Sequence, residues 1–196
     1  MLFIISVIIF SQDIYFTPKR YVPVFGLKKL IPAIPSLLLV FANIPLFAGM
    51  YFFAGTEKKI FALAGVIAAT GYIVCSATSS FIQLSFLPGL IKSGNYGTVD
   101  FLNMTNPQSV ICSLANLGYL FLAVSFLFFS FLFNQRGLQS WIKSTFVIYP
   151  IAVILGTIGY LADIRMLESM ILLSFLPYLA GIILSYVEFS RARVVL

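Results

Sequence analysis

Six apolar blocks alternate with short polar segments along the chain. A helix that spans a bilayer needs about 20 residues. The blocks predict helices over residues 1–16, 30–53, 60–86, 107–133, 144–162 and 166–186, the first of them short. Strands of a membrane barrel would alternate in polarity, and these blocks are nearly continuous. The pattern therefore predicts an all-α fold, a multi-pass transmembrane helical bundle of six helices, or of five if the first does not span.

The composition agrees with a membrane location. Hydrophobic residues make up 61% of the chain and charged residues 9%, where a soluble domain carries roughly 25% charged residues. Lipid must therefore be part of the solvent, and we expect a single transmembrane domain over residues 1–196 in the plasma (inner) membrane of a bacterium. The net charge of +6 comes from basic residues scattered singly and in pairs between the apolar blocks. That distribution is typical of loop anchors beside lipid headgroups and not of a nucleic-acid surface.

One stretch inside the third block, "VCSATSSFIQ", is polar where its surroundings are apolar. Residues three or four apart lie on one face of a helix. By that spacing the third helix carries one stripe of small and polar residues: Gly65, Ala69, Tyr72, Ser76, Ser79 and Gln83. The fourth helix carries a second stripe: Ser109, Cys112, Asn116, Tyr119 and Ala123.

The two stripes should meet near the long connection, residues 87–106. Antiparallel neighbours place the end of the third helix and the start of the fourth at the same depth, so Gln83 should approach Ser109. The stripes then form either a polar half-cavity for a lipid or small apolar ligand, or a packed helix seam, which small residues favour. The candidate lining residues are Tyr72, Ser76, Ser79, Gln83, Ser109, Cys112, Asn116, Tyr119 and Asp163. For Gln83 and Asn116 both interpretations stay open, because an amide has four hydrogen-bonding sites to satisfy.

Asp163 belongs to a second polar segment, "GYLADIRMLESM". Asp163, Arg165 and Glu168 could form an intramembrane ion network, which would indicate a functional site. The alternative is a short turn between the last two helices, and the lengths of the flanking apolar runs favour it.

The residue inventory narrows the chemistry. The chain has no histidine, and its two cysteines, Cys75 and Cys112, are far apart in the sequence. We therefore expect no catalytic centre, no metal site and no cofactor. The leading hypothesis is a non-enzymatic membrane protein that acts through helix packing or ligand binding. The alternatives are a small-solute transporter or channel component, and a lipid-modifying enzyme with Asp163 as its acid. Expected partners are membrane lipids, with other membrane subunits or a homo-oligomer as further candidates.

From about Leu30 onward the chain resembles small six-helix integral membrane families of bacteria. The features that carry the resemblance are the long loop ahead of the fourth helix, the motif "SLANLGYLF", the basic turn "NQRGLQSWI" and the motif "GTIGYLAD". The resemblance implies a fold and brings no activity with it.

Overall fold

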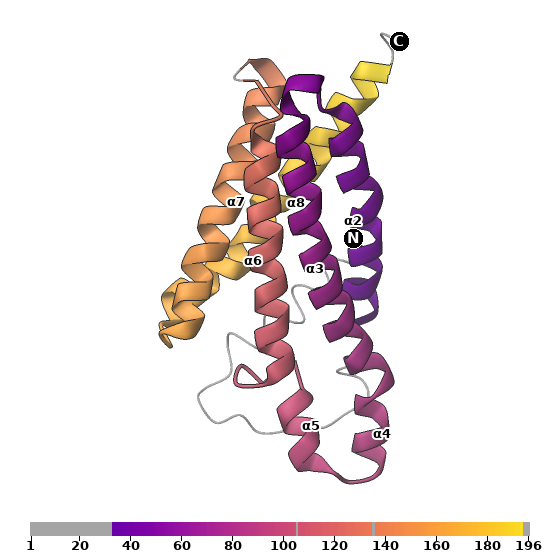
Figure 1. The fold of residues 1–196 in the computed structure, drawn as a ribbon. Coiled ribbons are helices and arrows are strands. Elements are labelled where there is room, and N and C mark those ends of the chain that lie inside the picture. Colours follow the sequence, from indigo (N-terminus) through magenta and orange to yellow (C-terminus); the bar gives the residue numbers. More distant parts are fainter. Residues whose placement is uncertain (1–32, 105, 135, 194–196) are drawn as a thin grey trace. The chain divides into compact units, whose positions relative to one another are not determined.

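The computed structural model describes residues 33–104, 106–134 and 136–193. Five of its helices are long and apolar enough to cross a membrane, and no strand occurs in the part of the chain that is described. This confirms the predicted all-α, multi-pass fold, while the predicted helix over residues 1–16 lies outside the described residues. Figure 1 labels the α-helices. The elements are α2 (Ala33–Phe53), the 3₁₀ turn η2 (Thr56–Lys58), α3 (Lys59–Ser85), α4 (Leu87–Lys92), α5 (Tyr96–Leu102), α6 (Val110–Ser130), α7 (Gly137–Leu161) and α8 (Arg165–Arg193).

The described residues fall into two compact units. Unit 1 holds residues 33–43 and 73–118, and unit 2 holds residues 44–72 and 119–193. Helices α2, α3 and α6 supply residues to both units, α4 and α5 belong to unit 1, and α7 and α8 belong to unit 2. The prediction of a single domain over residues 1–196 stays a prediction.

The long connection after α3 holds two short helices, which the sequence had not predicted. Pro88 lacks an N–H group and its ring crowds the carbonyl four residues earlier, which explains why α3 ends at Ser85 and α4 starts a new segment. The α4–α5 turn passes through Gly94, whose φ of 73° favours glycine. Asn95 then caps α5, because its Oδ1 accepts the Thr98 N–H at 3.4 Å.

Helices α7 and α8 extend beyond their predicted ends. Helix α7 begins at Gly137, seven residues before the predicted helix over residues 144–162, and α8 continues past the predicted end at residue 186 to Arg193. Both extensions have a partner. Gln139 of α7 donates from Nε2 to Glu188 Oε1 of α8 at 2.7 Å, and the ring of Phe189 lies 4.9 Å from that of Phe53.

Aromatic rings form the core of unit 2. Phe126 lies at the centre, and its ring contacts Phe146 at 4.4 Å, Tyr149 at 5.2 Å and Tyr178 at 5.6 Å between centroids. All four of these side chains are buried. Edge-on and tilted ring pairs at these distances are favourable, so α6, α7 and α8 are held together by large rigid groups.

Helices α3 and α6 pack closely in unit 2 because Gly65 has no side chain. A β-carbon at this position would stand 2.6 Å from the nearest ring carbon of Phe129, which is fully buried. Ser125 Oγ also donates to the Gly65 carbonyl at 2.8 Å. Gly65 therefore lets the two helices approach closely, and its carbonyl accepts a hydrogen bond from the neighbouring helix. Small residues commonly have this role between membrane helices.

We expect Gly65→Ala to destabilise the protein by about 1–3 kcal/mol, because the Phe129 ring has no room to move. The matched control is Gly97→Ala in α5. A β-carbon at Gly97 would meet nothing within 4 Å, so alanine should be neutral or stabilise α5 by up to about 1 kcal/mol. Unfolding by SDS in mixed micelles measures both. Equal stabilities of the two variants would contradict the assigned contact.

Candidate functional site

Helices α3 and α6 touch in unit 1, but on α6 the contact is at Gly118, which is not part of the predicted stripe. A β-carbon at Gly118 would stand 2.8 Å from Ser76 Oγ and 3.2 Å from Cys75 Cβ. The two helices therefore touch directly at Ser76, and a ligand has no room between them at that level. Counting along antiparallel helices from this contact places Gln83 level with the first turn of α6, at the depth that the sequence had predicted.

Gln83 uses its amide to hold the loop after α5. Its Nε2 donates to the Leu102 carbonyl at 2.6 Å, and its Oε1 accepts the Met104 N–H at 3.4 Å. Leu102 is the last residue of α5, where helix carbonyls lack partners within the helix. With 4% of its surface exposed, the Gln83 side chain is a buried clamp between α3 and the end of α5.

The predicted stripe on α6 bonds mostly to itself. Ser109 precedes the first residue of α6, and its Oγ accepts the Cys112 N–H at 3.0 Å. That is the geometry of an N-cap. Further along, Asn116 Nδ2 donates to Cys112 Sγ at 3.8 Å, and Asn116 is half-buried where Gln83 is fully buried. Ser109 therefore starts a helix, and Asn116 has the weaker of the two amide contacts.

Hydroxyl groups within the long helices bond back to the preceding turn. Ser79 Oγ donates to the Cys75 carbonyl at 2.8 Å and is almost fully buried. The same arrangement is found for Thr157, Ser174 and Ser185, which donate to the carbonyls of Val153, Ile171 and Gly181. Such bonds satisfy a hydroxyl without any partner from another helix.

Tyr72 and Tyr119 belong to a group of four tyrosines in unit 2. The phenol groups of Tyr72, Tyr119 and Tyr178 are close enough to that of Tyr149 to interact with it electrostatically. The four residues come from α3, α6, α7 and α8, one from each. The sequence stripes included Tyr72 and Tyr119 but missed Tyr149 and Tyr178. The missed pair had a signal, because each lies beside a proline in the middle of its helix.

Asp163 lies in the turn between α7 and α8, as the favoured interpretation predicted. It is exposed, and its φ of 54° is the one positive value among the described non-glycine residues. The Ile164 N–H bonds to the Gly159 carbonyl at 2.8 Å, and the Asp163 N–H lies 3.5 Å from the Tyr160 carbonyl. This pattern ends a helix at a left-handed residue, so Asp163 occupies a position that usually favours glycine.

Lys58 of η2 and Lys59, the first residue of α3, donate to carbonyls near the C-terminal ends of α6 and α2 in unit 2. Lys58 Nζ donates to the Leu132 carbonyl at 2.9 Å and to Asn134 Oδ1 at 3.1 Å. Lys59 Nζ donates to the Tyr51 carbonyl at 3.1 Å and lies 4.2 Å from the centre of the Tyr51 ring. Cations stabilise the carbonyl end of a helix. The sequence had assigned these residues only to the lipid surface.

The described acids and cysteines offer little to a metal ion. No group of three or more His, Cys, Asp or Glu side chains gathers within the described residues. Asp100 Oδ1 is a buried oxygen without a hydrogen-bond partner. A single carboxylate is too few ligands for a metal site, and Asn106 at this place donates to the Asp100 backbone carbonyl instead.

Comparison with known proteins identifies no relative. No family model matches the chain, and neither a curated protein nor a solved structure is significantly similar to it.

Replacing Gln83 by Leu should lower the free energy of unfolding by about 1–3 kcal/mol, because the buried side chain no longer bonds to the two partly buried backbone groups of Leu102 and Met104. The same change at Asn116, which is half-buried with one long contact to sulfur, should cost clearly less. Hydrogen exchange at Met104 provides a local measurement and should rise only in the Gln83 variant. If both variants behave alike, the clamp at Gln83 does not stabilise the loop.

Asp163→Gly should preserve or raise stability, by up to about 1 kcal/mol, because glycine adopts a positive φ without strain. Asp163→Val should lower stability, since a β-branched residue is strained in that conformation. Thermal unfolding in detergent distinguishes the two variants. A severe loss in the glycine variant would show that the carboxylate itself stabilises the turn and would contradict the assignment to backbone conformation alone.

Proposed function

We propose that this chain is a non-enzymatic multi-pass protein of the bacterial inner membrane. It acts by packing its helices against lipids and against the helices of other membrane subunits. The observation that carries the proposal is the use of its intramembrane polar groups. Gln83 holds the end of α5, and the Ser79 and Ser125 hydroxyls donate to helix carbonyls of the same chain. These polar groups therefore already have partners within the chain, as packing without a ligand requires.

The outward surface supports the same proposal. Large apolar side chains are exposed on every long helix, among them Phe52, Ile67, Phe81, Ile148 and Leu176. In a bilayer these faces contact acyl chains or the helices of another subunit, and not water. The resemblance of the sequence to small six-helix membrane families of bacteria is consistent with this proposed role.

The lipid-binding and transport hypotheses differ in what they require of the α3 stripe. A transport path needs water along most of the stripe, while a half-cavity needs it only near the α3–α6 loop. In the packed arrangement water reaches neither part, since Ala69, Ser79 and Ser109 are all buried.

Cysteine scanning separates these cases. In a chain carrying Cys75→Ala and Cys112→Ala, single cysteines at Ala69, Ser79 and Ser109 should resist a charged thiol reagent applied from both sides of the membrane. Ser93→Cys, at an exposed position after α4, is the reactive control. Modification at all three positions would favour a transporter or channel. Modification at Ser79 and Ser109 alone would favour a ligand site, and either result would overturn the packing proposal.

A further inference from the structure

Helix α6 marks where the hydrocarbon ends on the side of the α3–α6 loop. Its 21 residues extend about 31 Å at 1.5 Å per residue, which matches a hydrocarbon core of about 30 Å. Val110, its first residue, therefore lies near the boundary. Because Gly118 packs against Ser76 and Cys75, the equivalent level on α3 is at Gln83.

The chain continues well beyond that level before it turns. Phe86 N–H bonds to the Ile82 carbonyl, and Leu90 N–H to the Phe86 carbonyl, so α4 continues in the direction of α3 (Figure 1). From Gln83 to Lys92 the rise is about 14 Å. The headgroup layer on one side of a bilayer is only about 5–8 Å thick. The α4–α5 pair thus crosses the headgroup layer, and its turn reaches water.

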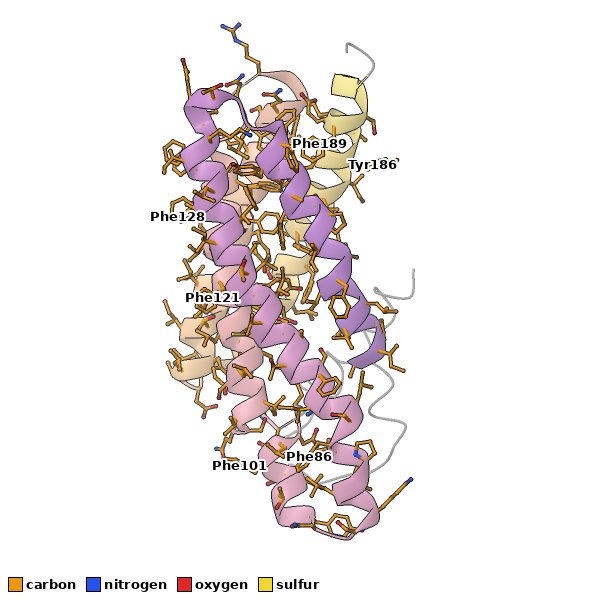
Figure 2. The ribbon with its side chains drawn as sticks, turned by 45° about the vertical axis from the view of Figure 1, so that its right-hand side comes forward. Phe86, Phe101, Phe121, Phe128, Tyr186 and Phe189 are labelled. Carbon is orange, nitrogen blue, oxygen red and sulfur yellow. The ribbon has the colours of Figure 1, made fainter. Side chains whose placement is uncertain are left out.

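One side of the α4–α5 pair is packed and the other is exposed. Leu87 and Val99 form a buried cluster with Leu90, Ile91 and Leu102 packed against it. Phe86 and Phe101, by contrast, each expose 57% of their surface. Since Leu87 faces Val99 on antiparallel segments, Phe86 and Phe101 lie at the same level, as Figure 2 shows. That level is about 5 Å beyond Gln83.

The pair is held in a defined position at both ends. At its base the Gln83 amide binds the Leu102 carbonyl. At its tip Gly94 allows the turn, and Asn95 accepts hydrogen bonds from Thr98. The exposed rings are therefore presented at a fixed depth, with the cationic Lys92 at the tip beyond them.

We propose that Phe86 and Phe101 anchor the α4–α5 pair in the headgroup layer of the bilayer, with the lipid boundary between acyl chain and headgroup as their partner. Aromatic side chains on an amphipathic helix favour the region of the headgroups and the upper acyl chains, and the backbone at both rings lies about 5 Å beyond the hydrocarbon edge, inside the headgroup layer. Lys92, which is exposed at the tip, adds attraction to anionic headgroups. This inference concerns a surface that the packing of the long helices does not use.

The test uses tryptophan fluorescence in vesicles with anionic lipid. The natural Trp141 is replaced by Phe, and a single Trp is placed at Phe101 or, as the matched control, at Tyr96. Both positions are exposed to a similar degree, 57% and 51%, but Tyr96 lies at the tip. The Phe101→Trp variant should be quenched by spin labels at the headgroup and the upper acyl chain. The Tyr96→Trp variant should be quenched several-fold more strongly by aqueous iodide.

Three results would overturn the proposal. Equal iodide quenching of the two variants would place the pair in water. Protection of Phe101→Trp from both iodide and labelled lipid would show that protein covers it. Quenching of Phe101→Trp mainly by labels deep in the acyl chain would place the pair inside the hydrocarbon. Phe86→Trp, on the other segment at the same level, should give the same quenching as Phe101→Trp. It replaces Phe101→Trp in the test if Phe101→Trp does not fold.

Discussion

Hydrocarbon offers no hydrogen-bond partner, so each polar group in a spanning helix must find one inside the protein. The polar stretch of α3 meets this requirement in two ways. Ser79 bonds to its own helix, and Gln83 bonds to the loop that follows α5. The hydroxyls of Thr157 and Ser185 repeat the first solution in α7 and α8. The polarity of these helices is thus compatible with a protein that has no internal ligand, because each of these groups has a partner within the chain.

The same requirement explains where the small residues lie. Lipid tails are as apolar as leucine, so helices in a membrane associate through close contact and not through exclusion of water. Gly65 admits the Phe129 ring in unit 2, and Gly118 admits Ser76 in unit 1. Gly156 and Gly159 do so for α8, where an added β-carbon would meet Ile171 and Glu168. The glycines therefore allow the close helix contacts, and the hydroxyl groups have partners within these packed helices.

Run length was sufficient to predict the long helices, and spacing placed Gly65 and Ser76 on one face of α3. The α6 residues that meet this face, Gly118 and Ser125, were not in the predicted stripe. Run length and spacing could not predict α4 and α5, because a proline and several glycines interrupt the amphipathic pattern there. These two short helices also pack mainly against each other. Nor could run length and spacing predict the Gln83 clamp, since helical spacing reports which face a residue occupies and not which carbonyl lies opposite. Tyr149 and Tyr178 were missed because their neighbours on both sides are apolar. The early start of α7 and the late end of α8 lie beside a contact between Gln139 and Glu188, which are distant in sequence.

The connection between α3 and α6 is longer than is needed to join the two helices. Gln83 and Val110 lie at one level, so a few residues would join the two helices, yet the chain uses all of residues 84–109. Connections between helices in bundles are commonly two to eight residues long, and much longer ones usually carry function. This one has its own apolar cluster and is held by a buried amide from α3. A buried amide is costly unless it is bonded, and here it fixes a surface element. The polar end of α3 is therefore best explained by the α4–α5 pair that it supports.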